Sequence, residues 1–217
     1  MNAISSTSLE ASPFPADHDR RAGALEAALA ADAPSAESEE WRYSPIGDLD
    51  LASYSATLER PEGVDLPIID ELVDGAAGAS EVVTTVTIVD GWITSVSPGP
   101  KWPATGLTVE TVETRQPAGP EHPEADQLDL LHQALAPSTL VISVKPGATI
   151  DGSIIIQSHH RAGGRAAFPH VRVEAGSDAE VSIIEYQTSE PGAGLSVPLL
   201  ELQAAVRQIR QARGIQR

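Results

Sequence analysis

Residues 142–147 read Ile-Ser-Val-Lys-Pro-Gly, and residues 171–176, 29 positions later, read Val-Arg-Val-Glu-Ala-Gly with the apolar residues in the same phase. A further 29 positions give Leu-Glu-Leu-Gln-Ala-Ala at residues 200–205. Ile154 and Ile155 of the first unit also recur as Ile183 and Ile184 in the second. Each unit therefore predicts an alternating strand, a small-residue corner and a second apolar strand, with closing loops at residues 161–167 and 190–194.

A single unit of this kind cannot bury its two short apolar strands, whereas stacked units satisfy backbone and side chains together. Stacked units form a parallel β-helix, in which we expect Val144, Val173 and Leu202 to share one column. The sequence holds about two and a half units, so we expect an incomplete β-helix. At its last strand, unpaired backbone groups would offer a template for another strand, which predicts self-association through this open end.

The region before the repeat predicts mixed α/β structure. Residues 21–31 indicate a short helix, with Leu25 and Leu29 on a narrow apolar stripe that must dock on something. Residues 82–96 predict a β-hairpin, because Asp90-Gly91 favours a type I′ turn. A short strand is expected at residues 107–112 and a linker at residues 116–124. A second helix should begin at Asp126 and end before Pro137.

The expected organisation has four parts: a flexible leader at residues 1–18, an N-terminal helical domain with a β-hairpin at residues 19–125, the start of the β-helix at residues 126–203, and a basic tail at residues 204–217. The tail carries four of the 14 basic residues and no acidic residue. A helical cap over the last unit is one interpretation of the tail. A truncated or frame-shifted product is the other.

Composition excludes several classes of function. The 31 acidic residues outnumber the 14 basic ones, and a net charge of −17 disfavours nucleic-acid binding. The absence of cysteine excludes disulfides, thiolate metal sites and cysteine nucleophiles. No apolar stretch is long enough to span a membrane and no targeting signal is evident, so we expect no membrane partner and a cytoplasmic location.

Four segments, in this order, resemble the SufB/SufD family of iron–sulfur cluster assembly proteins, and SufD more than SufB. They are residues 39–45, reading Glu-Glu-Trp-Arg-Tyr-Ser-Pro; residues 89–92, reading Val-Asp-Gly-Trp; residues 129–136, reading Asp-Leu-Leu-His-Gln-Ala-Leu-Ala; and residues 168–176 with 181–185. The resemblance covers roughly residues 30–203. It implies a right-handed β-helix, preceded by a largely helical domain and followed by a C-terminal domain that docks the SufC ATPase.

The resemblance implies a non-catalytic scaffold subunit of a SufBCD-type complex, with a SufB-like scaffold and a SufC-like ATPase as partners. The iron–sulfur cluster and ATP would then enter only through the partner subunits. The sequence stops before the family's C-terminal part, so the residues that lie near the cluster in the family have no counterpart positions here. Trp41, Arg42 and Tyr43 are expected to be structural, with the aromatic cluster anchoring the first helix to the next domain.

The pattern of polar residues does not identify a catalytic or ligand-binding site. A metal site drawn from His159, His160, His170, Glu174 and Glu185 has a suitable donor set. Adjacent histidines point opposite ways on an extended chain, however, so a solvated loop is the favoured interpretation for the first two. His132, beside the leucines of the second helix, is expected to be a partly buried packing residue. We therefore assign no catalytic, cofactor-binding or metal residue.

Enzyme chemistry finds no further support. The chain has no Gly-x-Ser-x-Gly nucleophile motif, and its glycine-rich stretches at residues 75–78 and 163–164 lack the Lys-Ser/Thr end of a P-loop. A rival interpretation is a bactofilin-like structural protein that polymerises end to end, because residues 145–154 resemble one of its coils. A hexapeptide-repeat acyltransferase is a second rival, but it requires a period of six residues rather than 29.

Overall fold

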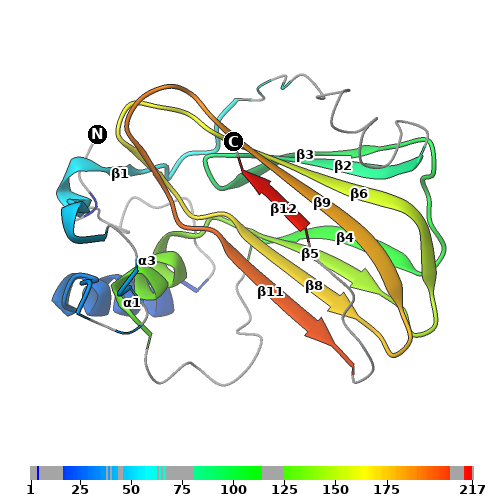
Figure 1. The fold of residues 1–217 in the computed structure, drawn as a ribbon, viewed down its shortest axis with the longest axis horizontal. Helices are drawn as coiled ribbons and strands as arrows, with labels where there is room; N and C mark the ends of the chain where they lie inside the picture. The colour runs from blue at the N-terminus through cyan, green and yellow to red at the C-terminus, as the bar shows by residue number, and fades with distance from the viewer. Residues whose placement is uncertain are drawn as a thin grey trace.

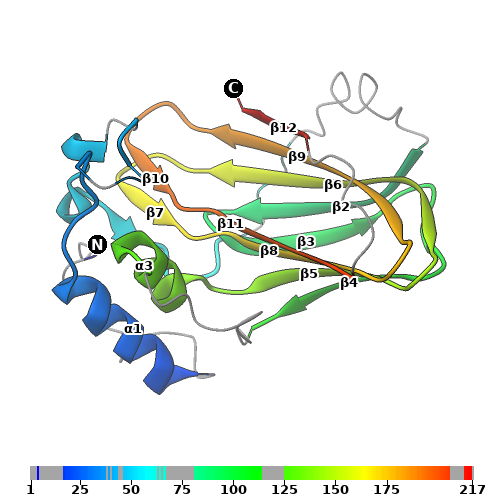
Figure 2. The same ribbon diagram turned by 60° about the horizontal axis from the view of Figure 1, so that its bottom comes forward.

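A computed structural model of the chain describes residues 4, 17–37, 39, 41–43, 46–62, 64, 66, 81–113, 125–205 and 213–216. Within these residues the protein is mainly β, with three mostly parallel sheets and two α-helices side by side at one end (Figures 1 and 2). The helices are α1 (His18–Ala30) and α3 (Gln127–Leu135), with short 3-10 helices η3 (Ile46–Asp48) and η4 (Leu51–Ser53). The strands are β1 (Ser55–Ala56), β2 (Val82–Val89), β3 (Trp92–Pro98), β4 (Leu107–Val112), β5 (Thr139–Val144), β6 (Thr149–His160), β7 (Arg165–Ala167), β8 (His170–Ala175), β9 (Glu180–Ser189), β10 (Gly194–Ser196), β11 (Leu199–Ala204) and β12 (Arg213–Gln216).

The predicted repeat strands occupy corresponding places in two of the sheets. One sheet has the order β11-β8-β5-β4, and a second has the order β12-β9-β6-β2-β3. Every pairing among β5, β8 and β11, and among β6, β9 and β12, is parallel. Consecutive units therefore lie one above another, joined by backbone hydrogen bonds.

The predicted column of Val144, Val173 and Leu202 is wrong at its first step. Val173 does pair with Leu202, 29 positions on, but the residue opposite Val173 in β5 is Ile142, and Val144 pairs with Ala175. The step from β5 to β8 is thus 31 residues, whereas the step from Ile154 in β6 to Ile183 in β9 is 29. A difference of two residues preserves which face each side chain occupies, so the apolar positions still meet.

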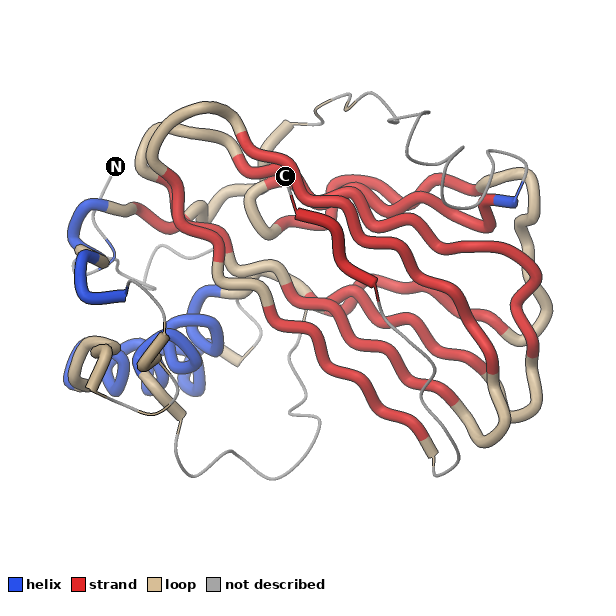
Figure 3. Tube along the Cα trace, in the orientation of Figure 1, coloured by secondary structure: helices blue, strands red, loops and turns tan. Residues whose placement is uncertain are grey.

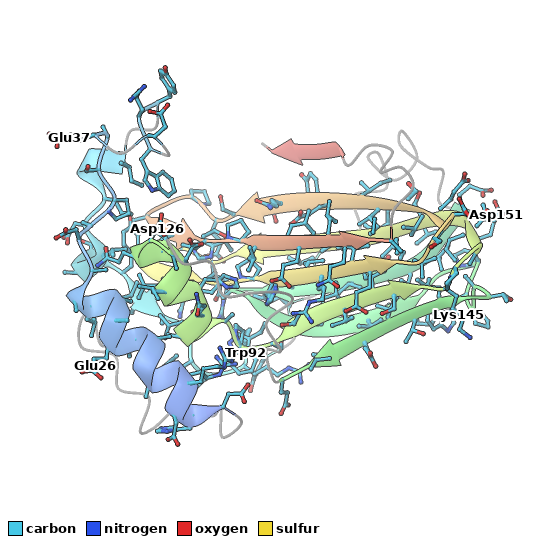
Figure 4. All side chains as sticks on the ribbon, turned by 90° about the horizontal axis from the view of Figure 1, so that it is seen from below. Glu26, Glu37, Trp92, Asp126, Lys145 and Asp151 are labelled. Atoms are coloured by element: carbon cyan, nitrogen blue, oxygen red, sulfur yellow. The ribbon has the colours of Figure 1, made fainter. Side chains whose placement is uncertain are left out.

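Two additional residues in β6 cause this difference. The register with β9 shifts between Thr149 and Ser153, and the register of β6 with β2 shifts at the same level. Gly152 lies here with a φ of 127°, against the carbonyl of Glu81, where any side chain would collide. Lys101 pairs with both Glu81 and Asp151 at this corner, and Figure 4 shows Asp151 at the end of the molecule remote from Asp126 and the helices.

The first segment expected to be a closing loop, residues 161–167, contains the short strand β7, and the short strand β10 begins at the last residue of the second, residues 190–194. β7 and β10 pair in parallel, with Arg165 opposite Gly194, and β1 adds to the other side of β7 (Figure 3). Strands of three residues or fewer leave too little alternation in the sequence to be recognised. Each of the two central units therefore contributes to three sheets, not two.

The β-hairpin at Asp90-Gly91 is confirmed. Asp90 and Gly91 have φ values of 48° and 87°, as a type I′ turn requires, and β2 and β3 pair in antiparallel fashion around them. β2 also pairs in parallel with β6, and β4 pairs with β5. The hairpin and β4 are thus continuous with the sheets of the repeat, so the expected boundary at residues 125/126 is crossed by two sheets.

Both helices are confirmed, and α3 begins as predicted. The Asp126 side chain accepts from the Asp129 amide, while the Asp129 side chain accepts from the Asp126 amide, which forms a capping box. Leu128, Leu131 and Leu135 of α3 are buried. On α1, Leu25 is buried but Leu29 is 47% exposed, so the predicted leucine stripe is half wrong.

Buried Arg21 packs α1 against the end of α3 instead. Its guanidinium donates to the carbonyls of Ala134 and Ala136 at 3.1 and 2.7 Å. These carbonyls lie at the last turn of α3, where no following turn of helix supplies amide donors and the helix dipole is negative. The arginine therefore acts as a C-terminal cap supplied by another helix.

The apolar core has two main parts. One lies between the two large sheets, with Val86, Ile88, Ile142, Ile154 and Ile156 at its centre. The other joins the helices to the β7 region around Leu131 and Phe168. Among the described residues, no helix has both the length and the apolar character needed to cross a bilayer.

The ends of the chain differ in part from expectation. Ile4, within the expected leader, is buried and donates its amide to the Tyr54 carbonyl. In the tail, Arg213–Gln216 form strand β12 beside β9 and not part of a helical cap. The rest of the tail after residue 205, most of the leader, the linker at 116–124 and the glycine-rich stretch at 75–78 lie outside the described residues.

Candidate functional site

Strand β11 is the edge of its sheet in the described part of the chain. It pairs with β8 from Leu199 opposite His170 to Ala204 opposite Ala175, and its other side has no paired strand there. Opposed residues of parallel strands point to the same face. Leu200 and Leu202 therefore follow Val171 and Val173, which are buried in the core between the sheets.

The two leucines of β11 are nevertheless among the most exposed apolar side chains described. Leu200 is 47% exposed and Leu202 is 46% exposed, although the valines opposite them are buried. We call Leu200, Leu202 and the backbone edge of β11 the β11 edge. It combines backbone groups that pair with no other described strand with core-type side chains, which suits the addition of another strand.

A buried polar network links β8 to this edge. His170, whose side chain is fully buried, lies with Nδ1 2.9 Å from Thr139 Oγ1 and Nε2 3.1 Å from a Glu201 carboxylate oxygen. The Arg172 Nε donates to the same Glu201 oxygen at 2.8 Å. Burial acts to raise the pKa of Glu201, but the Arg172 hydrogen bond and the nearby His170 outweigh it and hold the pKa below its ordinary value. Glu201 is therefore ionised at neutral pH.

His132 extends this network to α3. Its Nε2 lies 3.1 Å from the Pro169 carbonyl, and its ring meets the edge of the His170 ring at 5.2 Å between centroids. The expectation of a packing residue is confirmed, with burial more complete than predicted, because His132 is 3% exposed. The network fastens helix, central strand and edge strand to one another.

A second polar cluster surrounds the hairpin turn. The Asp90 carboxylate is fully buried, accepts from the Arg161 amide at 2.8 Å and from Arg161 Nε at 2.7 Å, and lies 3.5 Å from His160 Nδ1. His160 Nε2 is 3.2 Å from the Arg165 carbonyl. Because a carbonyl can only accept, Nε2 carries the proton. Burial lowers the pKa of His160, although Asp90 acts to raise it, so the ring is neutral at pH 7.

A pocket of about 280 Å³ opens beside this cluster, at the corner between the sheet of β6 and β9 and the sheet of β7 and β10. We call it the corner pocket. Its lining residues are Ile88, Gly91, Ser158, His159, His160, Ala167, Pro169, Gln187, Thr188, Ser189, Gly194 and Ser196.

The structure does not bring the candidate metal ligands together. His159 and His160 are the last two residues of strand β6 and line the corner pocket, so the expectation that they lie in a solvated loop is wrong. His170 lies in the network with Glu201. Glu174 accepts from the Ser143 hydroxyl and Glu185 from the Gln187 amide, each on its own sheet. Throughout the described residues, no group of three or more His, Asp or Glu side chains is arranged to hold a metal ion.

Trp41 and Tyr43 of the aromatic cluster lie in different environments. Trp41 packs on the core near the helices and donates its indole N–H to Asp126 at the start of α3, so it anchors this segment as expected. Tyr43 is 91% exposed, and Arg42 pairs with Glu39 on the surface. The expectation that Tyr43 packs is wrong, because nothing in the described structure covers its ring.

Sequence reasoning missed the roles of Asp90, Arg21 and Glu201. A type I′ turn accepts Asn or Asp equally, so the hairpin signal says nothing of a buried carboxylate at Asp90. Arg21 and Glu201 occur in segments where charged residues normally face water. The sequence could have predicted only the contact of Glu201 with Arg172, because Glu201 follows Arg172 by 29 positions, the period of the repeat.

Comparison with family models and with curated proteins finds no match for this chain.

Proposed function

We propose that this protein is a non-catalytic, SufD-like scaffold subunit that works through protein contacts in a SufBCD-type iron–sulfur cluster assembly complex. The observation that carries the proposal is the β11 edge, where Leu200 and Leu202 are half-exposed in line with buried Val171 and Val173. A monomer gains nothing from core-type side chains left in water, whereas a partner that continues the sheet would bury them.

The fold we propose for residues 139–204 is a right-handed parallel β-helix. Its support is the repeated three-strand unit, in which β5, β6 and β7 are followed by β8, β9 and β10 in parallel register. Connections between parallel strands of one sheet are right-handed in nearly all proteins. A stacked β-helix presents its end strands to a neighbour, which fits a scaffold role.

The proposed partners are a SufB-like scaffold at the β11 edge and a SufC-like ATPase within the same complex, in the cytoplasm. Iron–sulfur clusters and ATP would be handled by those partners. Backbone pairing at the β11 edge supplies affinity, and the leucine pair supplies the apolar anchor.

Co-purification from cells that also express a SufB-like and a SufC-like protein tests the proposal. Leu200→Lys with Leu202→Lys should abolish retention, because burying two lysines unpaired at the seam is unfavourable. Leu29→Lys is the matched control, since Leu29 is also 47% exposed but lies on α1, and it should be retained like the unaltered chain. Failure of the unaltered chain to be retained contradicts the proposal.

The β11 edge also supports the alternative of a bactofilin-like protein that polymerises end to end. In that case the purified chain alone should form filaments or large assemblies in light scattering, and the double lysine variant should remain small. Some self-association is expected under either proposal, because an unpaired strand edge can pair with a second copy of the chain when its partner is missing. Filaments without retention by the SufB-like protein favour the alternative.

A further inference from the structure

The corner pocket has an unusual lining for a chain with a net charge of −17. Of the twelve described residues that line it, none is Lys, Arg, Asp or Glu. The hydrogen-bonding members are four hydroxyls, one amide and two imidazoles, contributed by Ser158, Thr188, Ser189, Ser196, Gln187, His159 and His160. The remaining wall is small or apolar.

The hydroxyls that the pocket exposes include those of Ser189 and Ser196, two exposed lining residues, and each can both donate and accept a hydrogen bond. The Ser158 hydroxyl and Nδ1 of His160 have almost no accessible surface, and that Nδ1 lies 3.5 Å from the buried Asp90 carboxylate, so a ligand in the pocket does not reach these two atoms. The accessible hydroxyls make the wall complementary to a molecule that carries hydroxyl groups of its own.

The charges around the pocket narrow the class of ligand. Asp90 is fully covered and already holds Arg161, so it offers no free carboxylate to a cation. The lining offers no ammonium or guanidinium to an anion. A charged ligand would lose its hydration without gaining a counter-charge, which is unfavourable. A neutral ligand loses much less.

We propose that the corner pocket binds a small neutral polyhydroxylated molecule, of the size of a monosaccharide or a short polyol. A volume of about 280 Å³ accommodates a molecule of that size, and the hydroxyls of Ser189 and Ser196 can exchange hydrogen bonds with it. Ile88, Ala167 and Pro169 provide an apolar wall for its carbon face. Such binding is independent of the β11 edge and of the scaffold role.

The test is a titration of the full chain, labelled with ¹³C in its histidine rings, with three probes of equal size: D-glucose, D-gluconate and D-glucosamine. The His160 ring signal, assigned from a His160→Gln variant, should shift with glucose and saturate in the millimolar range. The anionic and cationic probes should bind about tenfold more weakly or not at all, because of their desolvation.

Two variants at the pocket rim localise the response. Ser189→Leu and Ser196→Leu place a side chain over the opening at exposed positions, so both should fold and lose the glucose response. Ser182→Leu is the matched control, because Ser182 is an exposed residue of the same strand outside the pocket. An equal response to all three probes, a response that survives both rim variants, or no saturable shift with glucose overturns the proposal, the last result leaving only water in the pocket.

Discussion

Nε2 of His170 lies 3.1 Å from a carboxylate oxygen of Glu201, so a buried residue of β8 is paired with a residue of the edge strand β11. Arg172 shares that oxygen. Glu201→Ala leaves both partners buried without it, and we expect a loss of about 2 kcal/mol in the free energy of unfolding, measured by urea denaturation.

Glu180→Ala serves as the control for that change, because Glu180 is exposed on β9. Its effect should stay within about 0.5 kcal/mol. Equal effects of the two substitutions would show that the His170–Glu201 pair contributes nothing to stability.

Acidification should destabilise the protein through His160. Burial lowers the pKa of this residue below its ordinary value of 6.5. As pH falls through 6.5 the unfolded chain takes up a proton that the folded state resists, so stability falls with pH in that window. Melting temperatures between pH about 7.5 and about 5.5 should fall less steeply for His160→Gln than for the unaltered chain. Parallel slopes would contradict this expectation.

Two glycine substitutions should have opposite signs. A Cβ on Gly176 would lie 2.5 Å from the backbone nitrogen of Pro146, so Gly176→Ala should cost about 1–3 kcal/mol. Gly23 lies within α1 with open space around its Cα, so Gly23→Ala should stabilise by about 0.5–1 kcal/mol. Denaturant midpoints of the two variants measure both effects, and a harmless Gly176→Ala would mean that the units stack less tightly than described.

Arg21 should prove important for stability despite lying on a small helix. Arg21→Met keeps most of the apolar stem but removes the donors to Ala134 and Ala136, so we expect a loss of about 2 kcal/mol. Arg20→Met is the control, since Arg20 pairs only with nearby Asp17 at the surface among its described contacts. Thermal unfolding distinguishes them, and similar melting temperatures would refute the capping role.

Strand and helix positions were largely predictable because their side chains alternate or recur with clear periods. β4 matches its predicted range, and β8 and β11 begin one residue before theirs. The register of the first step was not predictable. The two extra residues near Gly152 are absorbed inside a strand, where the apolar pattern on both sides continues unchanged.

The candidate sites were much less predictable. The corner pocket depends on bringing residues near position 90, 160 and 190 together through β7 and β10, which are too short to leave a pattern. The network at His170 depends on the stacking of β11 beside β8, which brings Glu201 next to His170 and Arg172. Both are properties of three-dimensional stacking and not of local sequence.

Because of the two additional residues near Gly152, the first unit (β5 to β7) and the second unit (β8 to β10) are not interchangeable. In the first unit, the backbone at Gly152 lies against Glu81, and β6 pairs with β2 of the hairpin. Further along the chain, the steps from β7 to β10, from β8 to β11 and from β9 to β12 are all 29 residues. A chain with more units could therefore be extended by copying the second unit, whereas a copy of the first unit would shift the register with its neighbour by two residues.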